Sequence, residues 1–96
     1  MRLDLFLKTS RLIARRRLAQ EFCDKGLVSV NEGVAKSSKE IKAGDVIEIK
    51  QRDRVTRILV LQIPVTKQVS KNSAGELYRL VGETILENDP LNLGSR

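Results

Sequence analysis

The chain has 96 residues, the size of one compact domain, and its 41% hydrophobic and 31% charged composition is typical of a globular protein. Its longest apolar run, residues 58–61, is far too short to span a membrane, and no apolar stretch follows the first charges to suggest a secretory signal. The chain has no histidine, which excludes Ser-His and Cys-His catalysis, and its single cysteine excludes thiolate metal clusters and an internal disulfide. It also contains neither of the common glycine motifs that cradle phosphates. We therefore expect a soluble cytoplasmic binding protein with no enzymatic activity, cofactor or metal.

The positive charge is concentrated at the start of the chain. The whole chain carries a net charge of +6, whereas residues 58–96 contain equal numbers of acidic and basic side chains. A cluster dominated by arginine indicates phosphate binding, because the guanidinium fork matches phosphate oxygens and stays charged. Residues 1–17 hold one acid, Asp4, and six basic side chains: Arg2, Lys8, Arg11, Arg15, Arg16 and Arg17.

Hydrophobic spacing predicts two short helices in this basic region. Leu3, Phe6 and Leu7 follow the i, i+3, i+4 pattern of a helix buried on one side. A second helix is expected from Arg15 to Lys25, and Gly26 is placed to end it in a left-handed conformation. Its apolar stripe predicts buried side chains, including a core phenylalanine whose replacement by alanine costs about 3–5 kcal/mol. The stripe consists of Leu18, Ala19, Phe22 and Cys23.

Some of the basic side chains have a possible acidic partner one helical turn away. Lys8 lies four residues after Asp4, and Arg17 lies four residues before Glu21. For Lys8 and Arg17, a helical ion pair and a contact with an anionic partner are therefore equally compatible with the sequence.

Other basic residues have no such helical acid. Arg2, Arg15 and Arg16 lack an acid at this spacing, so we expect them to contact phosphates. Lys36 and Lys39 fall in a polar loop beside a predicted hairpin. They either extend the positive surface or belong to an ordinary solvated loop.

After Gly26 the hydrophobic period changes to two, which predicts a sheet. Gly33 and Gly44 are assigned to turns that need unusual backbone conformations. The expected fold is α+β: two short N-terminal helices packed on a small, mainly antiparallel twisted sheet of four or five strands. We expect one domain over 1–81, with a loop at 65–76 and a flexible tail over 82–96. The predicted strands are 27–30, 34–35, 46–50, 55–63 (the longest) and 77–81.

Several parts of the chain together form one sequence pattern: Arg2-Leu3-Asp4-x-Phe6-Leu7-Lys8-x-Ser10-Arg11-Leu12-Ile13-x-Arg15-Arg16, then Ala19, then Gly26-x-Val28-x-Val30-Asn31, then Lys42-x-Gly44-Asp45-x-Ile47. This pattern resembles the RNA-binding module named after small-subunit ribosomal protein four, also called the α-L motif. Glu32 intervenes between Asn31 and Gly33, and Ala43 stands where proline is frequent; both departures affect turns rather than the basic residues.

Within that module, the chain is most similar to the RqcP (YabO) family of bacterial ribosome-associated quality control. This resemblance implies a monomeric factor that contacts RNA of the large ribosomal subunit and a stalled peptidyl-tRNA, and works with an RqcH-type factor that adds C-terminal alanines. It also implies that Asp4 orients arginines or touches the partner factor. The side chains that it implies meet RNA phosphates are Arg2, Arg11, Arg15 and Arg16.

Three other functions remain open from the sequence. The related heat-shock-type ribosome rescue factor carries an extra basic C-terminal helix, and the short neutral tail here argues against it. An RNA-binding subunit of an RNA-modifying enzyme would need a separate catalytic chain, because 96 residues leave no room for a catalytic domain. An adaptor whose basic surface binds an acidic protein is the third.

Overall fold

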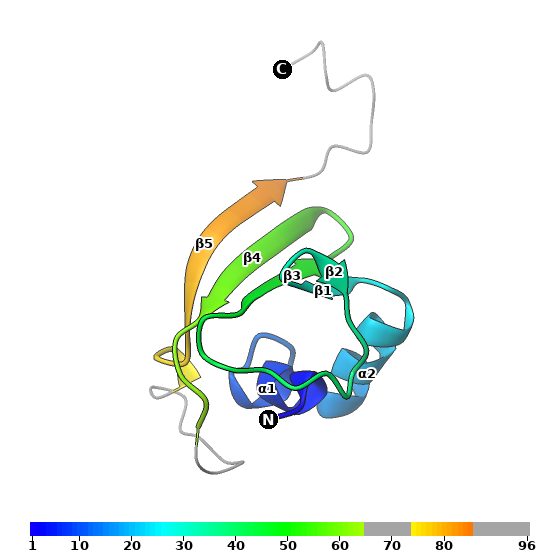
Figure 1. The fold of residues 1–96 in the computed structure, drawn as a ribbon. Helices are drawn as coiled ribbons and strands as arrows, with labels where there is room; N and C mark the ends of the chain where they lie inside the picture. The colour runs from blue at the N-terminus through cyan, green and yellow to red at the C-terminus, as the bar shows by residue number, and fades with distance from the viewer. Residues whose placement is uncertain (65–73, 86–96) are drawn as a thin grey trace.

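Two helices pack against one five-stranded antiparallel sheet with the strand order β2-β1-β3-β4-β5 (Figure 1), which confirms the expected α+β fold. The computed structural model describes residues 1–64 and 74–85. Within them, no helix is long and apolar enough to cross a membrane. The elements are α1 (Leu3–Thr9), α2 (Arg16–Asp24), β1 (Val28–Val30), β2 (Gly33–Val34), β3 (Val46–Lys50), β4 (Arg54–Val60) and β5 (Tyr78–Ile85).

One hydrophobic core joins the helices to the sheet. From α1, Leu3, Phe6 and Leu7 are completely buried, as their spacing predicts. From α2, the small Ala19 is completely buried and Cys23 nearly so, which allows the two helices to approach closely. The predicted stripe is wrong for Leu18, which is 40% exposed, because the short α2 presents only a narrow face to the core.

The loop that follows β2 fastens the start of α1. The Lys39 carbonyl accepts a hydrogen bond from the Leu3 amide at 2.7 Å, and the Ser37 carbonyl accepts one from the Asp4 amide at 3.1 Å. These amides belong to the first turn of α1, which has no side-chain cap of its own. Ile41 is buried and anchors the loop. We call residues 36–41 the strap.

The helix ends have different origins. Gly26 has φ +74° and donates its amide to the Cys23 carbonyl at 3.0 Å, which confirms it as the residue that ends α2. Arg11, just after α1, also has a positive φ, +64°, although it is not glycine. The predicted second helix is one residue too long at each end, because Arg15 and Lys25 are its caps.

The sheet departs from the prediction at its far side. β4 ends at Val60: the Leu61 amide still donates to the Leu77 carbonyl, its partner in the same register, but the Gln62 amide turns back to that same carbonyl. The longest strand is β5, and the register shift beside Ile58 leaves Val81 as an extra, bulged residue. β5 therefore continues through residues 82–85, which the sequence assigned to the tail. Most of the predicted loop (65–73) and the rest of the tail (86–96) lie outside the described residues.

The β1–β2 hairpin turns through two residues with positive φ, Asn31 at +52° and Glu32 at +73°. The expectation that Gly33 supplies the unusual conformation is wrong, because it is already part of β2. The Asn31 side chain stabilises the turn: its Oδ1 accepts from the Val46 amide at 3.0 Å, and its Nδ2 donates to Asp45 Oδ1 at 3.2 Å. Glu32 makes the turn in the left-handed region that favours glycine.

Replacing Glu32 by glycine should therefore stabilise the protein. Removing the β-carbon strain at φ +73° outweighs the extra freedom of the unfolded chain, and we expect a gain of about 0.5–1 kcal/mol in urea unfolding. Lys42→Gly, at an exposed loop position whose φ is not positive, is the control and should destabilise. A loss of stability in Glu32→Gly as large as in this control would contradict the prediction.

The two phenylalanines should differ in their contribution to stability. Phe6 is completely buried, so Phe6→Ala should cost about 3–5 kcal/mol. Phe22 only packs partly buried against the core, so Phe22→Ala should cost clearly less than the sequence alone predicts. Urea unfolding of the two variants measures both costs, and equal losses would show that partial exposure does not reduce the contribution of Phe22.

Candidate functional site

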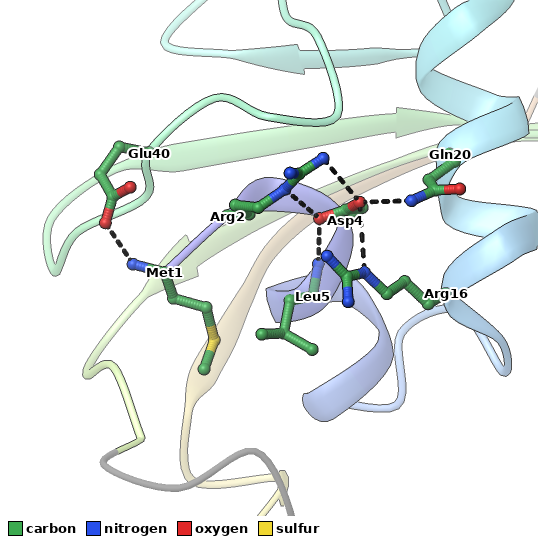
Figure 2. A network of polar contacts seen from close by, with 7 residues as sticks. All are labelled: Met1, Arg2, Asp4, Leu5, Arg16, Gln20 and Glu40. Atoms are coloured by element: carbon green, nitrogen blue, oxygen red, sulfur yellow. Dashed lines mark hydrogen bonds and ion pairs between the residues drawn. The ribbon is translucent and has the colours of Figure 1, made fainter.

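A buried carboxylate joins the beginnings of the two helices (Figure 2). Asp4 is 0% exposed, although it is charged and lies in the first turn of α1. We call Arg2, Asp4, Arg16 and Gln20 the Asp4 cluster. The two oxygens of Asp4 accept hydrogen bonds from Arg2 Nε and Nη2 (both 3.3 Å), Arg16 Nε (3.3 Å), Gln20 Nε2 (2.8 Å) and the Leu5 amide (2.7 Å).

The local sequence explains how these side chains meet. Arg16 and Gln20 are four residues apart and therefore lie on the same face of α2. The buried Ala19 beside them brings this face close to α1. The strap holds the first turn of α1 in place through its carbonyls, so Asp4 faces α2. The cluster is thus a product of tertiary packing.

The hydrogen bonds keep Asp4 ionised. Burial by itself raises the pKa of this carboxyl group, but the hydrogen bonds from Gln20 and the Leu5 amide, together with the Arg16 guanidinium, outweigh burial and lower the pKa below its ordinary value. Asp4 is therefore a fixed negative charge at neutral pH, and it holds two positive groups beside each other.

The arginines of the cluster remain accessible on their outer sides. The side chain of Arg2 is 46% exposed and that of Arg16 is 41% exposed. Arg2 contacts Asp4 through Nε and Nη2, which leaves its Nη1 out of contact with the carboxylate, whereas Arg16 contacts Asp4 through Nε and leaves both terminal nitrogens out of contact with it (Figure 2). One carboxylate balances only one of the two cations. The arrangement can present guanidinium donors in fixed orientations to an anion such as phosphate.

The start of α2 has an unfavourable charge distribution for a helix. Arg15, Arg16 and Arg17 stand at its positive end, the first turn contains no acid, and the Arg15 side chain makes no capping hydrogen bond. Arg15 and Arg17 are exposed. Because a sequence that breaks a local rule most often does so at a functional site, this end of α2 is a candidate for binding an anionic partner.

Neither of the two helical ion pairs that the sequence left open, Asp4–Lys8 and Arg17–Glu21, forms within the described residues. The Asp4 carboxylate contacts the arginines of its cluster and not Lys8, which is exposed in the last turn of α1. Among residues 1–64 and 74–85, no ion pair joins Arg17 to Glu21. The prediction that Arg2 and Arg16 have no acidic partner is also wrong, because counting along one helix cannot detect an acid on the other.

The remaining predicted site residues lie around this cluster at different places. Lys36 and Lys39 are exposed on the strap, and the Lys39 carbonyl binds the Leu3 amide next to Arg2. Lys8 and Arg11 lie at the opposite end of α1, and Arg11 is exposed there. The structure therefore brings Arg2 and Arg16 together directly, with the strap lysines on the adjacent loop.

The patterns in the sequence did not indicate Gln20 as a site residue, although its position one helical turn after Arg16 was a usable signal.

Cys23 is the small core residue that its apolar stripe predicts. Burial, with the nearby charges of Asp4 and Asp24, raises the pKa of the Cys23 thiol to about 11. The thiol stays protonated at neutral pH and is a poor nucleophile.

The fold and the basic cluster define a class of protein that binds RNA. The S4 domain family matches residues 1–47. The trimeric structure of heat shock protein 15 from Vibrio cholerae is similar with a TM-score of 0.76 and 30% identity, over 84% of this chain and 81% of that one. The solution structure of a protein designated HP1423 is similar with a TM-score of 0.75 and 36% identity, over 85% of this chain and 98% of that one.

Three relatives, each named "RQC P-site tRNA stabilizing factor", identify the family within this class. The Streptococcus pneumoniae protein is 38% identical over 89 residues, 93% of this chain and 99% of its own. The Bacillus subtilis protein is 39% identical over 83 residues (86% and 94%), and a Helicobacter pylori protein is 42% identical over 71 residues (74% and 84%). The chain belongs to the family of RQC P-site tRNA stabilizing factors, which confirms the resemblance found in the sequence.

Removing the charge of Asp4 should destabilise the fold and alter its response to acid. Asp4→Asn should cost about 1–3 kcal/mol at neutral pH, because two guanidinium groups lose their ionic acceptor. Because the folded pKa is lowered, the stability that Asp4 contributes is complete above its unfolded pKa, near 3.9, and is lost as pH falls toward the folded value. The variant should therefore lose less stability than the wild type on acidification through this range.

Urea unfolding between neutral pH and about pH 3 measures both effects. Asp24→Asn, which replaces an exposed acid in the last turn of α2, is the control and should change stability by less than about 0.5 kcal/mol. An Asp4→Asn protein as stable as this control at neutral pH would contradict the structural role of the cluster.

Proposed function

We propose that this chain is a non-catalytic factor that binds RNA of the large ribosomal subunit and the P-site peptidyl-tRNA during ribosome-associated quality control. The observation that carries the proposal is the Asp4 cluster, which holds two guanidinium groups in place at the arginine-rich start of α2. The names of the relatives support the same process. In it, the factor stabilises the tRNA while alanines are added to the stalled chain.

Each part of the basic surface has a distinct role in this proposal. Arg2 and Arg16 donate paired hydrogen bonds to phosphate oxygens, because their forks are already oriented. Arg15 and Arg17 add to the positive potential at the end of α2. Asp4 orients the arginines; its complete burial argues against direct contact with a partner factor.

The proposed partner is folded RNA, recognised mainly through its shape and backbone. Single-strand binders stack bases on aromatic side chains, but Phe6 is buried in the core and Phe22 packs against it. We therefore propose that Arg2 and Arg16 bind the phosphates of a helical or otherwise structured region. Further phosphate contacts are proposed for Lys8, Arg11, Lys36 and Lys39.

The family to which the chain belongs supports a ribosomal setting. We propose that the chain acts as a monomer in the cytoplasm, on the ribosome, together with an RqcH-type tailing factor.

Comparing Arg16 with the adjacent Arg17 distinguishes phosphate binding by oriented side chains from attraction by a diffuse electrostatic field. Arg16→Ala removes a fork held by Asp4, and it should weaken association with large subunits carrying peptidyl-tRNA by about tenfold or more. Arg17→Ala removes an exposed charge that no carboxylate orients in the part of the chain that the structure describes, and it should weaken association much less. Co-sedimentation of each variant with the subunits at one salt concentration gives the comparison.

Two further proteins make this comparison specific. Arg57→Ala, on β4 and paired with Glu48, is the control and should bind like the wild type. Arg16→Lys keeps the charge but not the fork, so it should restore little of the lost binding. Equal losses in Arg16→Ala and Arg17→Ala would instead show a diffuse field.

Salt should also weaken binding of the protein to RNA. If about four phosphates are neutralised, the logarithm of the binding constant should fall with the logarithm of the salt concentration at a slope of roughly −3 to −4, and insensitivity to salt would contradict the proposal.

A further inference from the structure

A hollow at the outer edge of the sheet has a composition unlike the Asp4 cluster. It measures about 360 Å³, which falls in the range of about 300–1,000 Å³ typical of small-ligand sites. It lies where the chain leaves the two-residue edge strand β2 and enters the strap. We call it the edge pocket. Its lining residues are Val30, Gly33, Val34, Ala35, Lys36, Ser38 and Lys39.

The edge pocket combines an apolar wall with a cationic rim. Val30 and Ala35 form a buried apolar surface, and Val34 is left 70% exposed beside them. Lys36 and Lys39 are the charged residues of the lining, to which no carboxylate of residues 1–64 and 74–85 belongs. A flat apolar group that carries a negative charge at its edge matches this combination.

We propose that the edge pocket receives the base of one unpaired RNA nucleotide, while Lys36 and Lys39 bind its flanking phosphates. The base face packs on the methyl groups of Val34 and Ala35 by dispersion and by loss of water. Ser38 supplies a hydroxyl group for a polar atom of the base or ribose. A wall made of methyl groups tolerates any base, so the pocket binds a nucleotide without selecting its sequence.

The walls of the pocket are formed before a ligand arrives. The Ala35 amide donates to the Val28 carbonyl at 3.0 Å, which fastens one side to the sheet. The Lys39 amide donates to the Lys36 carbonyl at 3.0 Å, and this turn sets the two lysines on one short loop. Since little has to be ordered on binding, even a small ligand can be held there.

The strap connects the edge pocket to the Asp4 cluster. Its carbonyls bind the amides of Leu3 and Asp4, immediately after Arg2, so one short segment borders both sites. This inference rests on the proposed function, because it assumes that RNA is the ligand of the adjacent arginines. A nucleotide that leaves a structured RNA held by Arg2 and Arg16 then has a place for its base nearby.

Methyl NMR with small probes tests the pocket directly. Adenosine monophosphate should move the methyl proton signals of Val34 and Ala35 upfield in a saturable manner, because a stacked ring shields protons above its face. Ribose 5-phosphate carries the same phosphate without a base, so it should not produce this upfield shift. Val34→Glu places a carboxylate beside the phosphate site, and it should weaken adenosine monophosphate binding by about tenfold or more. Val81→Glu, the same change at an exposed valine of β5, should leave it unchanged.

The outcomes distinguish the pocket from the proposed function. The pocket proposal would be overturned, and the proposed function would stand, if large subunits still bound but the methyl signals did not move with either probe or moved equally with both. The same result is expected if the pocket accepts a protein side chain instead. If the nucleotide bound the pocket but subunits did not bind the protein, the proposed function alone would fail. Arg16→Ala should keep the nucleotide-induced shifts, because Arg16 does not line the pocket.

Discussion

The basic surface depends on one buried carboxylate. Asp4 accepts hydrogen bonds from Arg2 just before α1, from Arg16 and Gln20 of α2 and from the neighbouring backbone amide, so its charge is stabilised although the side chain is completely buried. A buried charge without these donors would be costly. The same bonds hold Arg2 and Arg16 next to each other, where two free guanidinium groups would repel. The stability of the fold and the arrangement of the proposed binding groups therefore depend on the same contacts.

The cluster in turn requires the sheet. α1 has seven residues, too few to be stable in isolation, and its first turn is completed by carbonyls of the strap. The strap is anchored by Ile41 and follows the hairpin that Asn31 and Asp45 connect to the start of β3. Asn31 and Asp45 thus contribute to the cluster indirectly, because they position the hairpin that leads into the strap, and the strap positions the first turn of α1 with Asp4.

Patterns along the chain predicted the local structure well and the contacts between elements poorly. The period of two predicted β3 with its observed bounds, and Gly26 marked the end of α2, because both signals are local. The partnership of Asp4 with Arg16 spans 12 residues and two helices, so i,i+4 spacing suggested Lys8 instead. β5 was cut short at Gly82, because glycine after an apolar run resembles a strand end and the bulge that precedes it leaves no clear sequence signal.

If Arg2 and Arg16 bind phosphates as proposed, the Asp4 cluster also lowers the entropic cost of RNA binding. A free arginine side chain loses roughly 1.5–2 kcal/mol of rotamer freedom when it is immobilised. Arg2 and Arg16 lose part of that freedom when the protein folds, so less remains to be lost when a phosphate arrives. A carboxylate that lowers the net positive charge can thereby strengthen binding to an anion. The chain, with a net charge of +6, would then gain affinity because two arginine side chains are already ordered. Additional positive charge would instead attract any polyanion.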